Sequence, residues 1–292
     1  MGGGESVMAD TSGTNSYSRQ DSIEPIVGLN GLTLGDHQLS PEIICTVLSY
    51  VPVDNLILNC RLVCKNWKYL IDDQTIWRLK CDQNKIALPR SLLVHGTPLH
   101  FYRTMCIKNP YGRNFIKNPC GEEGMRYWHY RNGGNGWVIE KPPVGADDFN
   151  QVEELCVAGI QSCFASSYQS CTKYQTIDLI SEGCHDFVLD QVQPEIKIED
   201  WHAGRFDCAC RYVLLVQLLD GMGNELQQFT TGDIDEPQWT GRKWSKVKHT
   251  FSDYGAGLRY IKFFQRGHDL QFWNGNYGSK MTASSICITL KN

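Results

Sequence analysis

Aromatic and polar side chains alternate in one glycine-rich stretch near the C-terminus, and that composition suits a surface that binds sugar. The stretch runs from His268 to Gly278 and is centred on Phe272-Trp273-Asn274. A pyranose ring has an apolar C–H face and a rim of hydroxyls, so its receptor needs an exposed aromatic ring beside a few fixed polar groups. The same residues allow a second interpretation, in which Phe272 or Trp273 closes the end of a hydrophobic core.

Catalytic and metal-binding arrangements find less support in the residue spacing. Asp207 and Asp269 are the acids that a glycosidase pair would use, but their spacing does not establish the required separation of about 5–9.5 Å. Cys208-Ala209-Cys210 places two thiols on one strand face, whereas a zinc site needs four ligands and the chain has no CxxC pair. We therefore predict no catalytic residue, no metal and no cofactor.

Composition excludes several classes of protein. Of the 292 residues, 41% are hydrophobic and 21% are charged, which is typical of a globular chain. The first 36 residues hold five acids and one arginine, which accounts for the net charge of −4 and leaves no basic excess for nucleic acid.

The expected location is the cytoplasm. The sequence has no transmembrane segment, since no stretch approaches the roughly 20 apolar residues that one needs, and it has no secretory signal. The odd count of 13 cysteines favours free thiols in a reducing compartment.

The first 35 residues are rich in Gly, Ser, Thr and acids, and we predict a flexible acidic tail. Met1 to Ser6 fits the M-G-x-x-x-S pattern for myristoylation of Gly2. The alternative is a disordered start that carries Gly2 and Ser6 by chance.

A small helical unit is predicted over residues 36–83, followed by a helical linker over 84–108. Ser40 suits an N-cap and Pro41 the first helical position, and apolar residues recur after them at helical spacing. Pro52 ends that helix, and shorter helices follow. About 45 residues in short helices bury little core, so such a unit usually leans on a partner.

Residues 109–292 have the pattern of an antiparallel β-sandwich or barrel. Tyr212, Leu214, Val216 and Leu218 line one face of a predicted strand, and Asp220–Asn224 supplies a turn. Alternation returns in Leu258–Phe264 and Ile286–Leu290, and Gly/Asn-rich turns separate the strands.

Two segments carry a resemblance to known families. Residues 37–51, with Arg61–Trp67 and Trp77, resemble an F-box, although Ser40 stands where the usual Leu-Pro-Pro-Glu opening has proline. Residues 109–288 resemble the F-box-associated domain of the sugar-recognising F-box proteins. The markers of that domain are Asn118–Gly124, Gly133–Trp137, Phe164–Tyr168, Ile198–Arg205 and His249–Gly255.

The resemblance implies a multidomain fold, α followed by all-β, with a helical F-box before a jelly-roll-like or galactose-binding-like β-sandwich. It also implies a non-catalytic substrate receptor of a cullin-RING ubiquitin ligase, which reaches the cullin and RING subunits through a Skp-type adaptor. We expect the adaptor to contact four residues of the first helical segment: Leu39, Pro41, Ile44 and Leu48.

The implied clients are misfolded, ER-derived glycoproteins with high-mannose N-glycans, held at the chitobiose core. Family positions that touch sugar match Tyr168, Asp207 and Phe272-Trp273-Asn274. Glycan-binding members often have Tyr-Trp-Lys at the last loop, so this chain lacks a hydroxyl and an ammonium there. The alternative function keeps the adaptor role with a glycan-independent client. At single residues, Asp207 can instead pair with Arg205 or Arg211, and Tyr168 can be a buried core residue.

Overall fold

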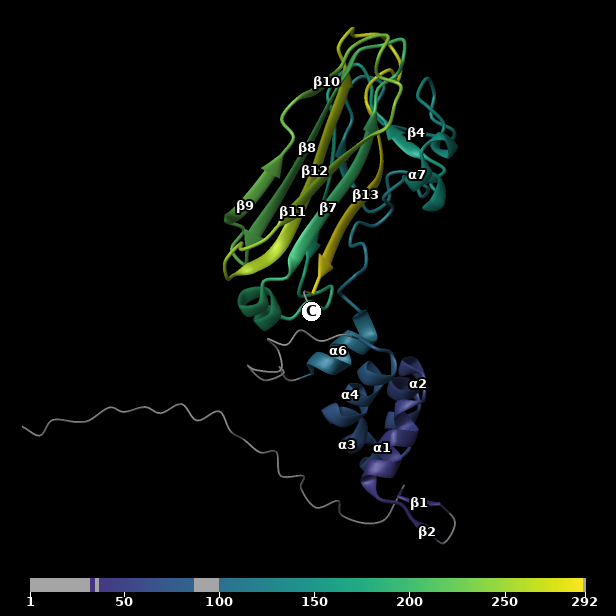
Figure 1. The fold of residues 1–292 in the computed structure, drawn as a ribbon, viewed down its shortest axis with the longest axis vertical. Coiled ribbons are helices and arrows are strands. Elements are labelled where there is room, and N and C mark those ends of the chain that lie inside the picture. Colours follow the sequence, from purple (N-terminus) through teal and green to yellow (C-terminus); the bar gives the residue numbers. More distant parts are fainter. Residues whose placement is uncertain (1–31, 35–36, 87–99, 291–292) are drawn as a thin grey trace, which may run out of the picture.

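Two kinds of structure follow one another along the chain, a helical unit and then two packed β-sheets (Figure 1). The computed structural model describes residues 32–34, 37–86 and 100–290. Most of the predicted tail, Gly2 with it, and residues 87–99 of the predicted linker lie outside the described residues. Among the helices in the described ranges, none combines the length and the apolar character that crossing a membrane requires.

The helical unit is built from short helices around a small core. Its elements are β1 (Thr33–Leu34), β2 (His37–Gln38), α1 (Pro41–Ser49), α2 (Val53–Leu58), η1 (Cys60–Leu62), α3 (Lys65–Asp72), α4 (Gln74–Gln83) and α6 (Phe101–Lys108). Trp77 fills the centre, where it is 1% exposed, and its indole Nε1 donates to the Ile71 carbonyl at 2.7 Å.

Two helix starts in this unit show different capping. The Asp73 carboxylate accepts from the Thr75 N–H at 2.7 Å and caps α4. Ser40 occupies the N-cap position of α1 in extended backbone, but its side chain makes no capping hydrogen bond. The start of α1 therefore depends on Pro41, whose missing N–H needs no partner there.

Antiparallel strands form two sheets, which confirms the predicted sandwich. The larger sheet has the order β10-β8-β12-β6-β3 with β9 beside β8, and the other has the order β11-β7-β13-β5-β4. The strands are β3 (His129–Arg131), β4 (Val138–Glu140), β5 (Cys163–Ala165), β6 (Cys171–Asp178), β7 (Glu195–Ala203), β8 (Cys210–Asp220), β9 (Glu225–Thr230), β10 (Ile234–Glu236), β11 (Ser245–Phe251), β12 (Leu258–Asp269) and β13 (Lys280–Thr289). Three short helical elements lie between strands: η2 (Phe149–Gln151), α7 (Glu153–Val157) and η3 (Val188–Val192).

Alternation in β8 positions the sandwich core as predicted. The side chains that the pattern assigns to one face are fully buried between the sheets: Tyr212, Leu214, Val216 and Leu218. The turn after β8 also forms, because the Asp220 carboxylate accepts from the N–H groups of Met222 and Asn224, each at 2.8 Å. Hydrophobic burial on this face holds the larger sheet against the smaller one.

A polar network crosses this otherwise apolar interior. The Asp200 carboxylate of β7 accepts hydrogen bonds from Tyr212 and from Gln265 Nε2, the latter at 2.5 Å, and Ser284 Oγ donates to it at 2.7 Å. Lys173 of β6 donates to Gln265 and lies over the Trp128 ring, 3.5 Å from its centroid. The network therefore joins β6, β8 and β12 of one sheet to β7 and β13 of the other.

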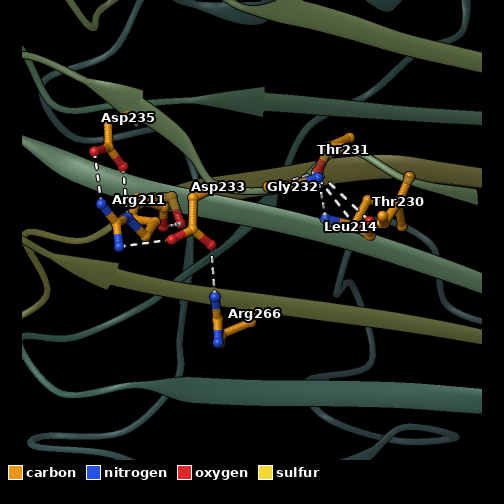
Figure 2. Close-up of polar contacts among 9 residues, drawn as sticks. Arg211, Leu214, Thr230, Thr231, Gly232, Asp233, Asp235 and Arg266 are labelled. Atoms are coloured by element: carbon orange, nitrogen blue, oxygen red, sulfur yellow. Dashed lines mark hydrogen bonds and ion pairs between the residues drawn. The ribbon is translucent and has the colours of Figure 1, made fainter.

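A second network lies outside the core and secures the edge of the larger sheet beside β8 (Figure 2). Arg211 pairs with Asp235 at 2.6 Å and with Asp233 at 2.6 Å, and Arg266 pairs with Asp233 at 2.7 Å. The Thr231 hydroxyl accepts from the Leu214 N–H at 3.0 Å where the chain passes from β9 to β10. These contacts occupy hydrogen-bonding groups that an open sheet edge would expose.

His202 is buried against this sheet and gives the stability of the sandwich a pH dependence. Its ring stacks on Tyr212 with centroids 4.4 Å apart, and its Nδ1 lies 3.8 Å from the Glu236 carboxylate. Burial lowers the pKa of His202 from 6.5 to about 4. Between these values the unfolded chain binds a proton that the folded chain does not, so the free energy of unfolding falls as the pH is lowered.

His202→Phe should remove much of this pH dependence. The phenyl ring keeps the stack on Tyr212 but does not titrate, so about 2–3 kcal/mol of stability that wild type loses between pH 6.5 and pH 4 should be retained. Urea unfolding at a series of pH values measures the difference. If the free energy of unfolding fell equally with pH in both proteins across this range, His202 would not be the source of the pH dependence.

Candidate functional site

Loops from several strands gather at the end of the sandwich that lies away from the helical unit (Figure 1). They are residues 132–137 after β3, 166–170 after β5, 204–209 after β7, 237–244 after β10 and 270–279 after β12. All five positions predicted to touch sugar lie in these loops. Strand ends therefore bring together residues that are more than 100 positions apart in the chain.

The buried carboxylate of Asp269 shapes the loop after β12. It is 0% exposed, and its Oδ1 accepts from the backbone N–H groups of Gln271, at 2.9 Å, and Phe272, at 2.5 Å. Phe272 has a φ of +57°, a conformation that is rare for a bulky residue. Its ring is 72% exposed, so it does not close the core.

Trp273 belongs to a continuous line of side chains that reaches Asp207. Its indole is 42% exposed and meets the Tyr277 ring edge to face, with centroids 5.6 Å apart. The Arg205 guanidinium lies 4.3 Å from the centroid of Tyr277. Arg205 also binds Asp207 through two hydrogen bonds, at 2.7 and 3.0 Å. We call these four residues the Trp273–Asp207 line.

The pairing fixes both the position and the charge of Asp207. Its hydrogen bonds with Arg205 hold the pKa of the Asp207 carboxyl below the usual value, and they outweigh its partial burial, which acts to raise that pKa. The carboxylate is 40% exposed and has lone pairs beyond the two that Arg205 uses. It can therefore accept a hydrogen bond from an incoming hydroxyl or amide without leaving its ion pair.

The other two predicted positions border this line in different ways. Tyr168 is half-buried and packs on Gly134, where an added Cβ would lie 2.6 Å from Cε1 of the ring. Ser167 Oγ accepts from the Asn135 N–H at 2.9 Å and donates to the Gly275 carbonyl at 2.6 Å, which joins the loop of Tyr168 to that of Trp273. Asn274 is exposed beside Trp273.

A buried ion pair holds the base of one of these loops. Lys280 Nζ lies 2.6 Å from Glu140 Oε2, and the two side chains are 0% and 7% exposed. The same Glu140 oxygen accepts from the Val144 N–H at 2.7 Å. The segment that begins at Val144 then contacts the loop that carries Arg205. In this contact the Phe206 N–H donates to the Gly145 carbonyl at 2.8 Å. The ion pair thus braces the segment that carries Arg205.

Several apolar side chains of the helical unit are exposed. These side chains are at least half exposed: Ile43, Val47, Tyr50, Leu58, Leu62 and Val63. Exposed apolar patches of this kind mark docking sites for proteins.

The residues predicted to contact the adaptor differ in exposure. Ile44 and Leu48 are 6% and 2% exposed and pack inside the unit. Leu39 and Pro41 are half-buried. The exposed apolar residues of α1 are Ile43 and Val47, each one position before a buried one.

The two thiols considered as zinc ligands lie inside the protein. Cys208 and Cys210 are fully buried. Across residues 32–34, 37–86 and 100–290, no group of three or more His, Cys, Asp or Glu side chains is arranged to hold a metal ion.

The sequence did not assign Arg205 and Tyr277 to the site. From the sequence, Arg205 is only an ordinary ion-pair partner of Asp207, and Tyr277 is only one aromatic residue in the stretch from His268 to Gly278. Their proximity depends on the packing of two loops 70 residues apart. The available signal was an aromatic residue at position 277, four residues after Trp273.

Comparisons with known proteins match both parts of the chain. An F-box domain matches residues 37–79, and an F-box associated region matches residues 106–288. F-box only protein 17 of Homo sapiens is 37% identical over 268 residues, which cover 87% of this chain and 92% of that protein. F-box only protein 27 of Mus musculus is 37% identical, covering 86% of this chain and 90% of its own length.

A more distant likeness concerns the architecture alone. The structure of TmCBM61 in complex with β-1,4-galactotriose covers 62% of this chain and 100% of that chain, at 12% identity and a TM-score of 0.37.

The chain belongs to the family of F-box only proteins that carry an F-box associated region. Its architecture is that of a substrate-recognition adaptor of an SCF-type ubiquitin ligase, in which the F-box engages a Skp-type adaptor and, through it, the cullin.

Lys280→Met should destabilise the sandwich strongly. It leaves Glu140 buried without its counter-ion, a change that typically costs about 3–5 kcal/mol. Adding Glu140→Gln should recover much of the loss, because the amide carbonyl can still accept from the Val144 N–H. Urea unfolding of both variants provides the measurement. A double variant no more stable than Lys280→Met would show that the buried charge is not the cause.

Proposed function

We propose that this protein recruits N-glycosylated clients to the ligase by binding the chitobiose core of their glycans in the Trp273–Asp207 line. The clients are misfolded glycoproteins of ER origin with high-mannose N-glycans, met in the cytosol. The chain itself performs no catalysis. It contributes proximity, because it holds client lysines near the conjugating enzyme at high effective concentration.

The observation that carries this proposal is an exposed indole beside a fixed carboxylate. Trp273 offers an apolar face for the C–H side of a GlcNAc ring, and Tyr277 supports it from the side. Asp207 offers acceptors for a hydroxyl or for the acetamide N–H, and Arg205 sets its orientation. Both groups are held before a ligand arrives, which lowers the entropy cost of binding.

The electrostatics argue against a hydrolase. A glycosidase needs one carboxylic acid whose pKa is raised, so that it can protonate the leaving oxygen. Arg205 lowers the pKa of Asp207, and the Asp269 carboxylate is committed to the backbone of its own loop. Asp207 is therefore poorly suited to donate a proton to a substrate, and Asp269 is 0% exposed.

A glycan-independent client is the second candidate, and one observation favours it. Besides Phe272, the loop end exposes Phe206 and Trp239, which are 42% and 60% exposed and meet edge to face at 5.4 Å. Exposed aromatic rings on neighbouring loops also suit an apolar polypeptide segment. The first candidate function predicts that free chitobiose binds the protein, and the second predicts that it does not.

Trp273→Ala should weaken chitobiose binding by at least about 30-fold, a hot-spot loss of ~2 kcal/mol or more. Asn274→Lys should strengthen it modestly by supplying an ammonium. Calorimetric titration of the full chain with chitobiose measures both effects.

Trp239→Ala is the matched control, since it removes an exposed indole that packs on Phe206 rather than on Tyr277. Its chitobiose affinity should stay close to that of wild type. A thermal melt of Trp273→Ala should also be unchanged, because its ring lies outside the core. Unchanged affinity in Trp273→Ala would rule out the stacking role, and absence of binding to wild type would favour the glycan-independent client.

Val47→Asp should weaken adaptor binding by about 30-fold or more if Val47 is a central anchor, because it places a charge in the apolar docking surface. Val157→Asp is the matched control, since Val157 is 83% exposed on α7 in the sandwich. Co-purification with a Skp-type adaptor tests both. Equal recovery of the adaptor with the two variants would refute this docking surface.

A further inference from the structure

Two cysteine side chains meet between the last helix of the F-box and the helix that leads into the sandwich. Cys81 of α4 and Cys106 of α6 place their sulfur atoms 3.5 Å apart. Each thiol also faces a carbonyl of the opposite helix: Cys81 Sγ lies 3.7 Å from the Tyr102 oxygen, and Cys106 Sγ lies 3.6 Å from the Trp77 oxygen. Both side chains therefore point into the α4–α6 contact.

A disulfide at this position needs only a small approach of the two sulfurs. The bond length is about 2.05 Å, so the atoms must move together by about 1.5 Å. The two cysteines are 25 positions apart and lie on helices that already pack together, so the pairing does not require the fold to rearrange.

The surroundings differentiate the two thiols. Cys81 is 0% exposed, whereas Cys106 is half-buried. The hydrogen bond from Cys81 lowers the pKa of Cys106, and the neighbouring Lys80 acts in the same direction. The same contact, with burial, raises the pKa of Cys81. Cys106 is thus the more nucleophilic and more accessible member, and Cys81 is positioned to react second.

We propose that Cys81 and Cys106 form a site of reversible oxidation, at which a small-molecule disulfide such as glutathione disulfide links α4 to α6. The Cys106 thiolate attacks one glutathione sulfur, the S–S bond of glutathione disulfide breaks, and one glutathione leaves as a thiolate. Cys81 then gives up its proton and attacks Cys106 Sγ, which releases the second glutathione. Two cysteines are oxidised, one glutathione disulfide is reduced to two glutathiones, and the two protons pass to the leaving thiolates.

Linking these helices matters because α6 also contacts the sandwich. Lys108 Nζ donates to the Ser181 carbonyl at 2.5 Å, and Thr104 borders a cavity of about 300 Å³ that Gly183 and Arg259 also line. A bond from α4 to α6 therefore restricts the element through which the F-box meets the client-binding domain.

Peptide mapping of the full chain tests the proposal. Trypsin releases residues 81–85 and 104–108 as short peptides with one cysteine each. After incubation of the reduced protein with glutathione disulfide, non-reducing mass spectrometry should detect these two peptides joined, and dithiothreitol should separate them. The oxidised chain should also melt several degrees higher than the reduced chain.

Three cysteine variants and one internal control define the result. Cys106→Ser and Cys81→Ser should each abolish the link, and Cys81→Ser should retain glutathione on Cys106. Cys45→Ser, which removes another buried thiol of the same unit, should leave the link intact. Exposed Cys156 should carry glutathione in every sample and so reports that the reagent was active.

Wild-type protein that carries glutathione on Cys156 but shows no linked peptides would overturn the proposal. Cys81 joined in equal yield to cysteines other than Cys106 would overturn it as well. Because both readings come from the wild-type chain, neither depends on a variant that folds poorly.

Discussion

The buried carboxylate of Asp200 is the contact on which the two sheets depend. It stands on β7 of the smaller sheet and accepts hydrogen bonds from Tyr212 and Gln265 of the larger one. A charge taken out of water in this way is tolerable only when its partners are complete, and Ser284 supplies the third hydrogen bond. The Lys173 amine donates to the same Gln265 side chain and so extends the network. Apolar faces alone allow sheets to slide, whereas this network permits one register. The positions of the strand ends, and of the loops they carry, follow from that register.

The loop end repeats the same principle closer to the surface. Asp269 and Glu140 are buried carboxylates, and each uses an oxygen to hold backbone N–H groups of a neighbouring loop. The exposed side chains near them, Trp273 and Asp207, therefore stand on loops whose backbone is held by hydrogen bonds. Buried carboxylates thus fix the backbone that carries the exposed side chains.

The sequence predicts the features that depend on local patterns, and it misses those that depend on tertiary packing. The alternation of β8 and the turn at Asp220 were predicted because period-two burial and Asp turn chemistry are local. The polar networks were not, since a lysine such as Lys173 in a strand normally indicates a solvent-facing position. On α1, Ile43 and Ile44 are both apolar. Helical periodicity alone therefore does not decide which of the two faces the core and which faces outward. Tyr277 and Arg205 meet only through tertiary packing.

The length of the sandwich has a consequence for ubiquitin transfer. β12 extends over 12 residues, or about 40 Å, from the end near the F-box to the loops around Trp273 (Figure 1). The sandwich therefore acts as a spacer, and under the proposed function it determines how far from the ligase a client bound at these loops is anchored. A client lysine must lie within reach of the conjugating enzyme from that anchor, so an extended, unfolded chain presents more usable lysines than a compact fold does. Under the proposed function, the length of the strands therefore favours unfolded clients.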